Sequence, residues 1–428
     1  MKKFSKLFLA LTLLCSVTAC GSKPAEEKKP EGTAAAPAEN KEEEKKDLDY
    51  SKYTIRIYSN SNSTERTTWL INEAKKQGFN ISIDDDTVIS GDNAAVQAAN
   101  ENKDGDLIFG LNETRWGQLV NNQYENVKIL DWKPSWADTV GAYKYDNKAY
   151  GLVIQNILML YRNDDLGTKG EEIHLDHWAD MVDFAKEHGY TWYRQNKVGG
   201  TTNSNINNSI LYAYVDPNSP AGGISVDGWK KLWEYCQDGW FSADDKLGFD
   251  PLNRGDVQIS TMYSSALYGK IDAAADGSKN PLVGTMEPEN WNLVDIKDGT
   301  YYIAEYIGLI DKPGRTEEET EIVKAFADWF GSAEVQVAWS EEFDSYPCNA
   351  DAVKELYPDG APAIYQLDNF ALKTVEGTDM TYAAYVAAHN AEWTNIMTNL
   401  GFYWADSTKA PTTPDWDNLD WSVLTQSK

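Results

Sequence analysis

Residues 53–109 alternate between two hydrophobic periods, which predicts strands and helices in turn. Apolar residues recur every second position in the strand patterns and every three to four positions in the helix patterns. This order predicts an α/β fold whose mostly parallel sheet is flanked by helices. The strand patterns lie at 53–58, 80–83 and 106–109, and the helix patterns at 62–78 and 93–101.

Polar loops follow the first and third predicted strands, at 59–62 and 110–113. Ligands gather at the carboxyl ends of strands in sheets of this kind, so both loops are candidate binding segments. Asn62 also fits the N-cap of the next helix, because Glu65 lies three residues later. The candidate ligand contacts in these loops are Asn60, Asn62, Asn112 and Glu113.

A long apolar run at 150–161 predicts an extended strand with one polar interruption, Gln155-Asn156. Buried amides need hydrogen-bond partners. The pair could cap two strand segments or turn one edge of the strand to water. Alternatively the strand could cross between lobes and present its amides to a ligand, which is the interpretation we favour. A further strand is predicted at 301–310, followed by a capped helix that begins at Thr316.

The N-terminus has the pattern of an export signal. A lysine-rich start precedes the apolar run 7–14, which is too short to span a bilayer as a mature helix. The ending Val17–Gly21 resembles a bacterial lipobox, which implies a signal peptide at 1–19 and lipid on Cys20; an ordinary signal cleaved nearby is the alternative. Residues 20–49 then form a disordered tether, because they lack the apolar side chains needed for a core.

Composition narrows the class of partner. The 428 residues include 39 Lys+Arg and 67 Asp+Glu, a formal net charge of −28. Such a surface repels nucleic acid and offers no electrostatic hold on an anionic membrane. The chain is long enough for two or three domains, and its 16 Trp and 24 Tyr argue against a disordered body.

Candidate metal and catalytic chemistry is sparse. His174 and His177, near Glu171 and Glu172, could bind a metal at helical spacing, but a solvated helix start is the favoured interpretation. No zinc spacing, phosphate loop or nucleophile motif is visible, so we expect neither a cofactor nor a metal. Pairing of Cys236 with Cys348 stays open.

Six segments, in this order, resemble the solute-binding proteins of ABC importers, in particular the sugar-binding class that includes maltose-binding protein. They comprise a strand with its polar loop, a tyrosine-bounded crossing strand, a loop and strand toward the ligand, a strand before the return crossing, a helix with Ser-x-Glu-x-Gln, and a Pro-x-Asn turn. The segments are 106–113, 150–166, 254–262, 283–288, 316–336 and 346–351.

The resemblance implies a type II periplasmic-binding-protein fold with two lobes that close on a ligand at the hinge. It implies a lipid-anchored, extracellular, monomeric protein at the outer face of the cell membrane, which delivers a small solute to an ABC permease. Lobe 1 is expected at 50–150 plus 305–350, and lobe 2 at 155–300 plus 351–428.

A carbohydrate is the favoured ligand, because sugars need carboxylates or amides for their hydroxyls and aromatic rings for stacking. Gln155 stands where the resemblance would place an acid. The same fold could instead bind a polyamine, a metal complex or an organic anion, the last through Arg56, Arg66 or Arg115. A surface glycoside hydrolase is a less favoured alternative. Further candidate contacts are Trp116, Gln155, Tyr263, Trp291 and Tyr306.

Overall fold

The computed structural model describes most of the chain beyond residue 47. The predicted signal peptide, Cys20 and most of the tether lie outside this described part, as does Asn62. The described residues belong to one compact unit, Leu48–Lys428. They are 48–61, 63–83, 92–145, 147–162, 173–195, 201–242, 249–264, 291–402 and 412–427.

The predicted parallel strands at the start of this unit are confirmed. β1 (Thr54–Ser59) pairs in parallel with β2 (Asn80–Ile83) and with β3 (Leu107–Leu111). The helices α1 (Thr64–Lys76) and α2 (Asp92–Asn102) follow β1 and β2 in the chain.

The N-cap of α1 differs from the prediction. The side chain of Ser63, not that of Asn62, accepts a hydrogen bond from the backbone N–H of Arg66. A serine hydroxyl satisfies an unpaired N–H of the first turn as well as an asparagine does, so the sequence pattern could not separate two adjacent caps.

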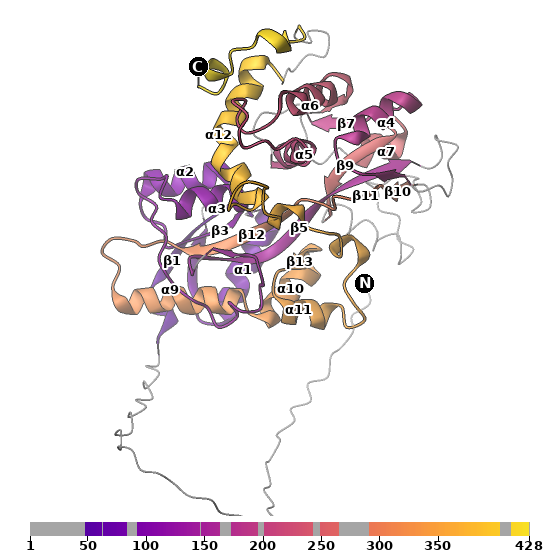
Figure 1. The fold of residues 1–428 in the computed structure, drawn as a ribbon. Helices are drawn as coiled ribbons and strands as arrows, with labels where there is room; N and C mark the ends of the chain where they lie inside the picture. Colours follow the sequence, from indigo (N-terminus) through magenta and orange to yellow (C-terminus); the bar gives the residue numbers. More distant parts are fainter. Residues whose placement is uncertain are drawn as a thin grey trace, which may run out of the picture. The chain divides into compact units, whose positions relative to one another are not determined.

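Two long strands extend the parallel core on the β3 side. β5 (Ala149–Arg162) and β12 (Tyr302–Leu309) pair antiparallel with each other, and β12 pairs antiparallel with β3. Among the described residues the sheet has nine strands, with the order β10-β5-β12-β3-β1-β2 and with β4, β9 and β13 paired to β5. The sheet is therefore mixed: β1, β2 and β3 are parallel, whereas β12 runs antiparallel to both of its neighbours, β3 and β5 (Figure 1).

The apolar side chains form two hydrophobic clusters along these strands. Cluster 1 packs β1 and β3 against α9 (Glu317–Phe330) and α10 (Ala333–Phe343). Cluster 2 lies around α4 (Asp180–His188), α5 (Thr201–Tyr212), α6 (Val226–Asp238) and α12 (Tyr382–Leu400).

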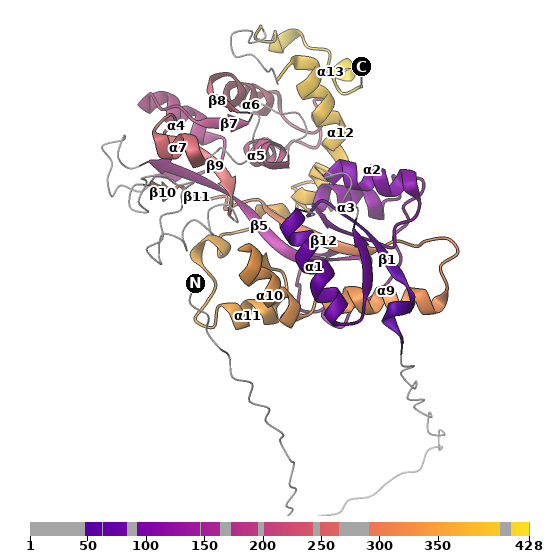
Figure 2. The same ribbon diagram turned by 180° about the vertical axis from the view of Figure 1, so that it is seen from behind.

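The two clusters share β5. Leu158 and Leu160 belong to cluster 1, whereas the alternating residues Ile157, Met159 and Tyr161 belong to cluster 2. Side chains alternate between the faces of a strand, so β5 supports both clusters at once. Figure 2 shows β5 running on from β12 to β9. The predicted lobe boundaries stay a prediction.

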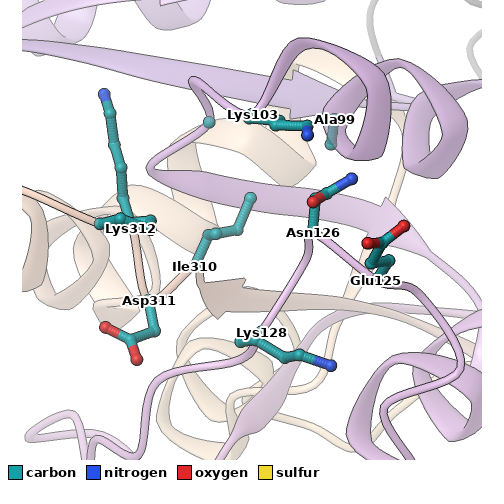
Figure 3. A pocket seen from close by; sticks show the side chains of 10 residues that line it. Ala99, Lys103, Glu125, Asn126, Lys128, Ile310, Asp311 and Lys312 are labelled. Atoms are coloured by element: carbon teal, nitrogen blue, oxygen red, sulfur yellow. The ribbon is translucent and has the colours of Figure 1, made fainter.

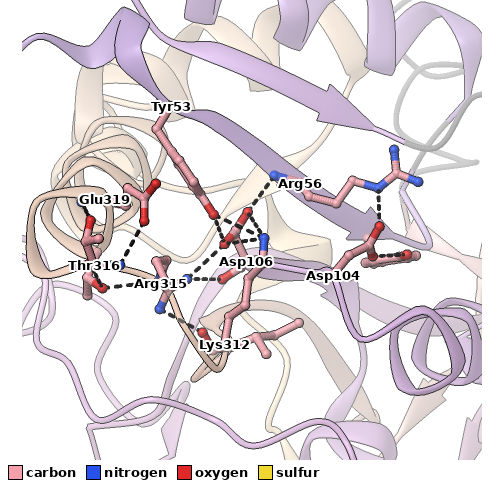
Figure 4. Close-up of polar contacts among 11 residues, drawn as sticks. Tyr53, Arg56, Asp104, Asp106, Lys312, Arg315, Thr316 and Glu319 are labelled. Carbon is pink, nitrogen blue, oxygen red and sulfur yellow. Dashed lines mark hydrogen bonds and ion pairs between the residues drawn. The ribbon is translucent and has the colours of Figure 1, made fainter.

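A buried acid next to the start of β3 links several segments around cluster 1. Asp106 is 0% exposed, and its carboxylate accepts hydrogen bonds from the Tyr53 hydroxyl at 2.7 Å and the Arg56 N–H at 2.9 Å. Lys312 and Arg315 form ion pairs with it at 3.3 and 3.2 Å (Figure 4). Asp106 thereby joins β1 and β3 to the connection between β12 and α9.

The predicted helix start at His174–His177 is wrong for His174. This residue lies in the short strand β6 (His174–Leu175), which pairs in parallel with β11 (Asp295–Ile296). His174 contacts Asp295 at 2.7 Å and His177 contacts Asp298 at 3.0 Å. Across the described residues, no group of three His, Cys, Asp or Glu side chains could hold a metal ion.

Both cysteines left open by the sequence are free thiols. Cys236 lies in cluster 2 and Cys348 in cluster 1, and both are buried. Within the described part of the chain, no helix has the length and apolar character needed to cross a bilayer.

The remaining elements are short or connect those above. The helices are α3 (Glu113–Val120), α7 (Phe249–Arg254), α11 (Ala350–Leu356) and α13 (Trp421–Leu424). The strands are β4 (Lys144–Tyr145), β7 (Tyr193–Gln195), β8 (Trp240–Ser242), β9 (Ile259–Tyr263), β10 (Trp291–Leu293) and β13 (Tyr346–Pro347). Short 3-10 helices cover Tyr50–Lys52, Ala363–Tyr365, Phe370–Leu372 and Trp416–Asn418.

Candidate functional site

The two crossing strands β5 and β12 are buried except for one partly exposed residue in each. Among the described side chains of β5 this residue is Gln155, and in β12 it is Glu305. The Gln155 Nε2 donates a hydrogen bond to Glu305 Oε1 at 2.9 Å. Two strands that are otherwise buried thus present one amide and one carboxylate together.

Two residues from the β1–α1 connection extend this pair. The Ser61 hydroxyl donates to Glu305 Oε2 at 3.2 Å, and Arg66 Nη1 donates to the Ser61 oxygen at 2.7 Å. Arg66, Ser61, Glu305 and Gln155 therefore form one hydrogen-bonded chain, which we call the polar row. It carries one cation and one anion, linked by a hydroxyl that accepts from one and donates to the other.

Local backbone geometry places Ser61. Its N–H donates to the Ser59 hydroxyl at 2.9 Å, which turns the chain directly after β1. Gly110, at the end of β3, lies against this turn with φ +77°, and a Cβ there would stand 2.8 Å from the Ser61 Cβ and 2.9 Å from its nitrogen. Only glycine allows this approach and this conformation without strain.

Aromatic rings hold Arg66. Its guanidinium carbon lies 5.9 Å from the ring centroid of Trp339 and 5.7 Å from that of Phe343, both on α10. A guanidinium over aromatic faces gains cation–π attraction and loses side-chain freedom. Arg66 is therefore held at the first turn of α1, close to the helix N-terminus.

The carboxylate of Glu305 is not fully satisfied electrostatically. Burial raises its pKa above the ordinary value, whereas Arg66, Ser61 and Gln155 act in the opposite direction without cancelling the effect of burial. An ionised carboxylate can accept about four hydrogen bonds. The contacts from Gln155 and Ser61 leave it capacity to accept hydrogen bonds from a ligand.

Strand register brings Tyr263 to the same face of β5 as Gln155. Ile157 is the register partner of Tyr263, and Ile157 follows Gln155 by two positions. Residues two apart on a strand share a face, and direct register partners do too. The partly exposed Tyr263 accepts a hydrogen bond at its hydroxyl from Asn205 Nδ2, on α5, at 3.1 Å.

Asn112 and Glu113 have contacts within the fold. The Asn112 side chain caps α3 by accepting from the Arg115 N–H at 3.3 Å. Glu113 is 5% exposed, and its Oε1 accepts from the Ala304 N–H at 2.6 Å, one residue from Glu305. Their roles as ligand contacts stay predictions.

Two of the four predicted aromatic contacts lie inside the core. Trp116 is 0% exposed and Tyr306 is 3% exposed, and their ring centroids lie 6.5 Å apart within cluster 1. Asn60 is partly exposed just after β1, and Trp291 begins β10. The Trp291 side chain and Asn62 lie outside the described residues. The ligand roles of all five residues stay predictions.

Ser61 and Glu305 were not among the predicted ligand contacts, and Arg66 was a candidate only for an anionic ligand. A signal for Glu305 was present, since it is the one charged residue in the strand 302–309. A charge in an otherwise buried strand requires partners, just as Gln155 does.

A cavity lies elsewhere, beside the start of β3 and the end of β12. Its volume is about 350 Å³, and the lysines at its rim extend in different directions (Figure 3). None of the predicted ligand contacts lines it. The lining residues are Ala99, Lys103, Gly105, Glu125, Asn126, Lys128, Ile310, Asp311, Lys312 and Pro313.

Residues 69–368 match the family described as bacterial extracellular solute-binding proteins. A probable ABC transporter periplasmic-binding protein, y4fP, from Sinorhizobium fredii is 24% identical over 307 residues, which is 70% of this chain and 75% of the relative.

Solved structures share the fold at low identity. A Trichodesmium protein described as being in complex with iron and citrate has a TM-score of 0.57 at 13% identity, covering 82% of this chain and 100% of its own. The apo ferric ion-binding protein A of Pasteurella haemolytica has a TM-score of 0.58 at 14% identity, covering 82% and 99%. A protein described as a GABA receptor has a TM-score of 0.53 at 12% identity, covering 79% and 94%. The type II periplasmic-binding fold is thereby shown.

Proposed function

The chain belongs to the bacterial extracellular solute-binding protein family, and from that premise we propose that its solute is a carbohydrate bound at the polar row. It is a binding protein of an ABC transporter and not an enzyme. The proposed role is to capture the sugar outside the cell and deliver it to the permease.

The contact between Gln155 and Glu305 carries this proposal. A sugar hydroxyl both donates and accepts hydrogen bonds, so it is best met by a site that offers both kinds of group side by side. The amide of Gln155 and the carboxylate of Glu305 do so at a 2.9 Å separation, on two strands that are otherwise buried. Tyr263, on the same face of β5, offers a ring and a hydroxyl.

An organic anion is the second candidate, supported by Arg66. Its guanidinium is held at the first turn of α1, where the helix N-terminus also favours negative charge. A carboxylate-bearing metal complex belongs to this class, and one structural neighbour is described as bound to iron and citrate. The anion is the weaker candidate, because Glu305 stands in the same row and repels it.

We also propose that lipid on Cys20 anchors the protein at the outer face of the membrane, with residues 21–49 as the tether. A lipid-modified cysteine would hold the protein at the membrane through its buried acyl groups. Cys20→Ser should therefore release the protein from the membrane fraction. Unchanged membrane association of this variant would contradict the anchor.

Thermal unfolding in the presence of mono- and oligosaccharides, organic acids and polyamines tests the solute class. A ligand at 100 times its Kd stabilises the folded state by about 2.7 kcal/mol, which shifts the unfolding midpoint measurably. We expect a shift with a neutral sugar that is lost in Gln155→Ala and retained in Glu342→Gln, a change at an exposed acid of α10. A shift with organic acids alone would replace the sugar by an anion.

A further inference from the structure

We propose that the polar row determines the charge of the solute that the protein accepts. Arg66 and Glu305 neutralise each other through Ser61, so the site selects a neutral solute over anionic and cationic forms of the same scaffold. This inference rests on the proposed function, because it concerns the same site.

The contacts make Arg66 and Glu305 one electrostatic unit. Ser61 is 6% exposed and accepts from Arg66 at 2.7 Å while donating to Glu305 at 3.2 Å. Arg66 also lowers the pKa of the Glu305 carboxyl through its charge. A solute with a net charge would be attracted by one end of the row and repelled by the other.

Two other ionisable groups near Glu305, Cys348 and Glu113, are buried within the fold. Burial raises the pKa of the Cys348 thiol, so the thiol is neutral. The carboxylate of Glu113 is 5% exposed, accepts from the Ala304 N–H and lies at the start of α3, where the helix N-terminus stabilises negative charge. Gln155 contributes an uncharged amide.

Removing the negative charge of Glu305 and removing the positive charge of Arg66 should shift the ligand selectivity in opposite directions. Glu305→Gln keeps the shape and leaves Arg66 uncompensated, so it should favour anions. Arg66→Met keeps an unbranched side chain beside Trp339 and leaves Glu305 uncompensated, so it should favour cations. Arg66→Lys keeps the charge and should keep the preference of the wild type.

Calorimetric titration of the full-length protein tests this with three matched probe sets: neutral sugars, their uronic acids and their amino sugars. We expect the wild type to bind the neutral set tightest. The ratio of anion to neutral affinity should rise about tenfold in Glu305→Gln, and the ratio of amine to neutral affinity by a similar factor in Arg66→Met, from a single charge-assisted contact. Circular dichroism verifies that each variant is folded.

The outcomes separate the two proposals. Suppose that a neutral sugar binds the wild type and both charge variants, and that all three proteins rank the neutral, acidic and amino probes in the same order. This result would overturn the role of the row and leave the carbohydrate function standing. Opposite charge preferences in the variants, without neutral-sugar binding by the wild type, would overturn the carbohydrate function and leave the role of the row standing. An Arg66→Lys variant that behaves as Arg66→Met would show loss of packing, not of charge, and would overturn the inference. Failure of every protein to bind any probe would overturn both.

Discussion

Gln155 and Glu305 meet diagonally across the β5–β12 ladder. The direct register partner of Gln155 is Ile303, and that of Glu305 is Val153, yet the amide and the carboxylate lie 2.9 Å apart. Long side chains reach such diagonal neighbours on one face of an antiparallel pair. The contact therefore depends on the register of the two crossing strands, which ties the polar row to the frame of the sheet.

The stability of the protein should reflect the ionisation of Glu305. Its raised pKa means that the folded protein binds this proton more tightly than the unfolded chain does. Above the folded-state pKa the carboxylate is ionised in both states, and the folded state carries an unfavourable buried charge. As the pH falls through the folded-state pKa toward the ordinary value of 4.5, the folded state is protonated first and this destabilisation disappears.

Glu305→Gln should therefore have a higher free energy of unfolding than the wild type near neutral pH. The difference should narrow as the pH falls through the folded-state pKa, because the protonated wild type resembles the amide. Urea unfolding between about pH 8 and about pH 4.5 measures this. A variant that is less stable than the wild type across that whole range would show that Arg66 and Ser61 outweigh burial.

The parts of the fold that depend on local pattern were predictable from the sequence. Alternation identified β1 and a long apolar run identified β5. The Thr316 capping box predicted the start of α9, where Thr316 and Glu319 form both reciprocal bonds. The antiparallel pairing of β12 with β3 joins residues about 200 positions apart, and no local pattern encodes it.

The candidate site was predictable in part for the same reason. Gln155 was recognisable as a polar residue in an apolar strand. The chain from Arg66 through Ser61 to Glu305 joins a loop to a strand 244 residues away, which only the three-dimensional fold brings together. Trp116 looked like a stacking platform, but Gly308 leaves room for its ring within the core, where a Cβ would approach it to 2.5 Å.

Asp106→Ala should be among the most destabilising single changes in cluster 1. It leaves the Arg315 side chain, which is 2% exposed, without its carboxylate partner and removes acceptors for Tyr53 and the Arg56 N–H. Breaking a buried ion pair from one side costs about 3–5 kcal/mol. Urea unfolding measures the loss directly.

Asp104→Ala is the matched control for Asp106→Ala. Asp104 is 50% exposed, lies 3.8 Å from Arg56 and accepts a hydrogen bond from the Tyr58 hydroxyl at 2.7 Å. The Tyr58 hydroxyl keeps its contact with Asn102, so removal of Asp104 should cost about 1–2 kcal/mol, less than removal of Asp106. Similar losses of unfolding free energy in the two variants would contradict the proposal that Asp106 holds β1, β3 and the connection to α9 together.

Cys236 and Cys348 should not react with thiol reagents in the folded protein. Both are buried, and burial raises the pKa of each thiol, so little nucleophilic thiolate is present at neutral pH. In a Cys15→Ser, Cys20→Ser background, titration with a chromogenic disulfide should detect no rapid thiol, and then both thiols after denaturation without reductant. Absence of thiol signal in the denatured protein would reveal a disulfide and contradict the free state.

Gly110→Ala should impair solute binding more than its effect on backbone strain accounts for. The new Cβ would stand 2.8 Å from the Ser61 Cβ and 2.9 Å from its nitrogen, so Ser61 must move and with it the link between Arg66 and Glu305. Gly78→Ala is the control, because Gly78 has φ +86° but no atom within 4 Å of the added Cβ. Each variant should lose about 1–3 kcal/mol of stability from the left-handed backbone.

Calorimetric titration with the neutral sugar that stabilises the wild type should then show weakened binding for Gly110→Ala and wild-type affinity for Gly78→Ala. Equal affinities in the two variants would place the solute away from Ser61.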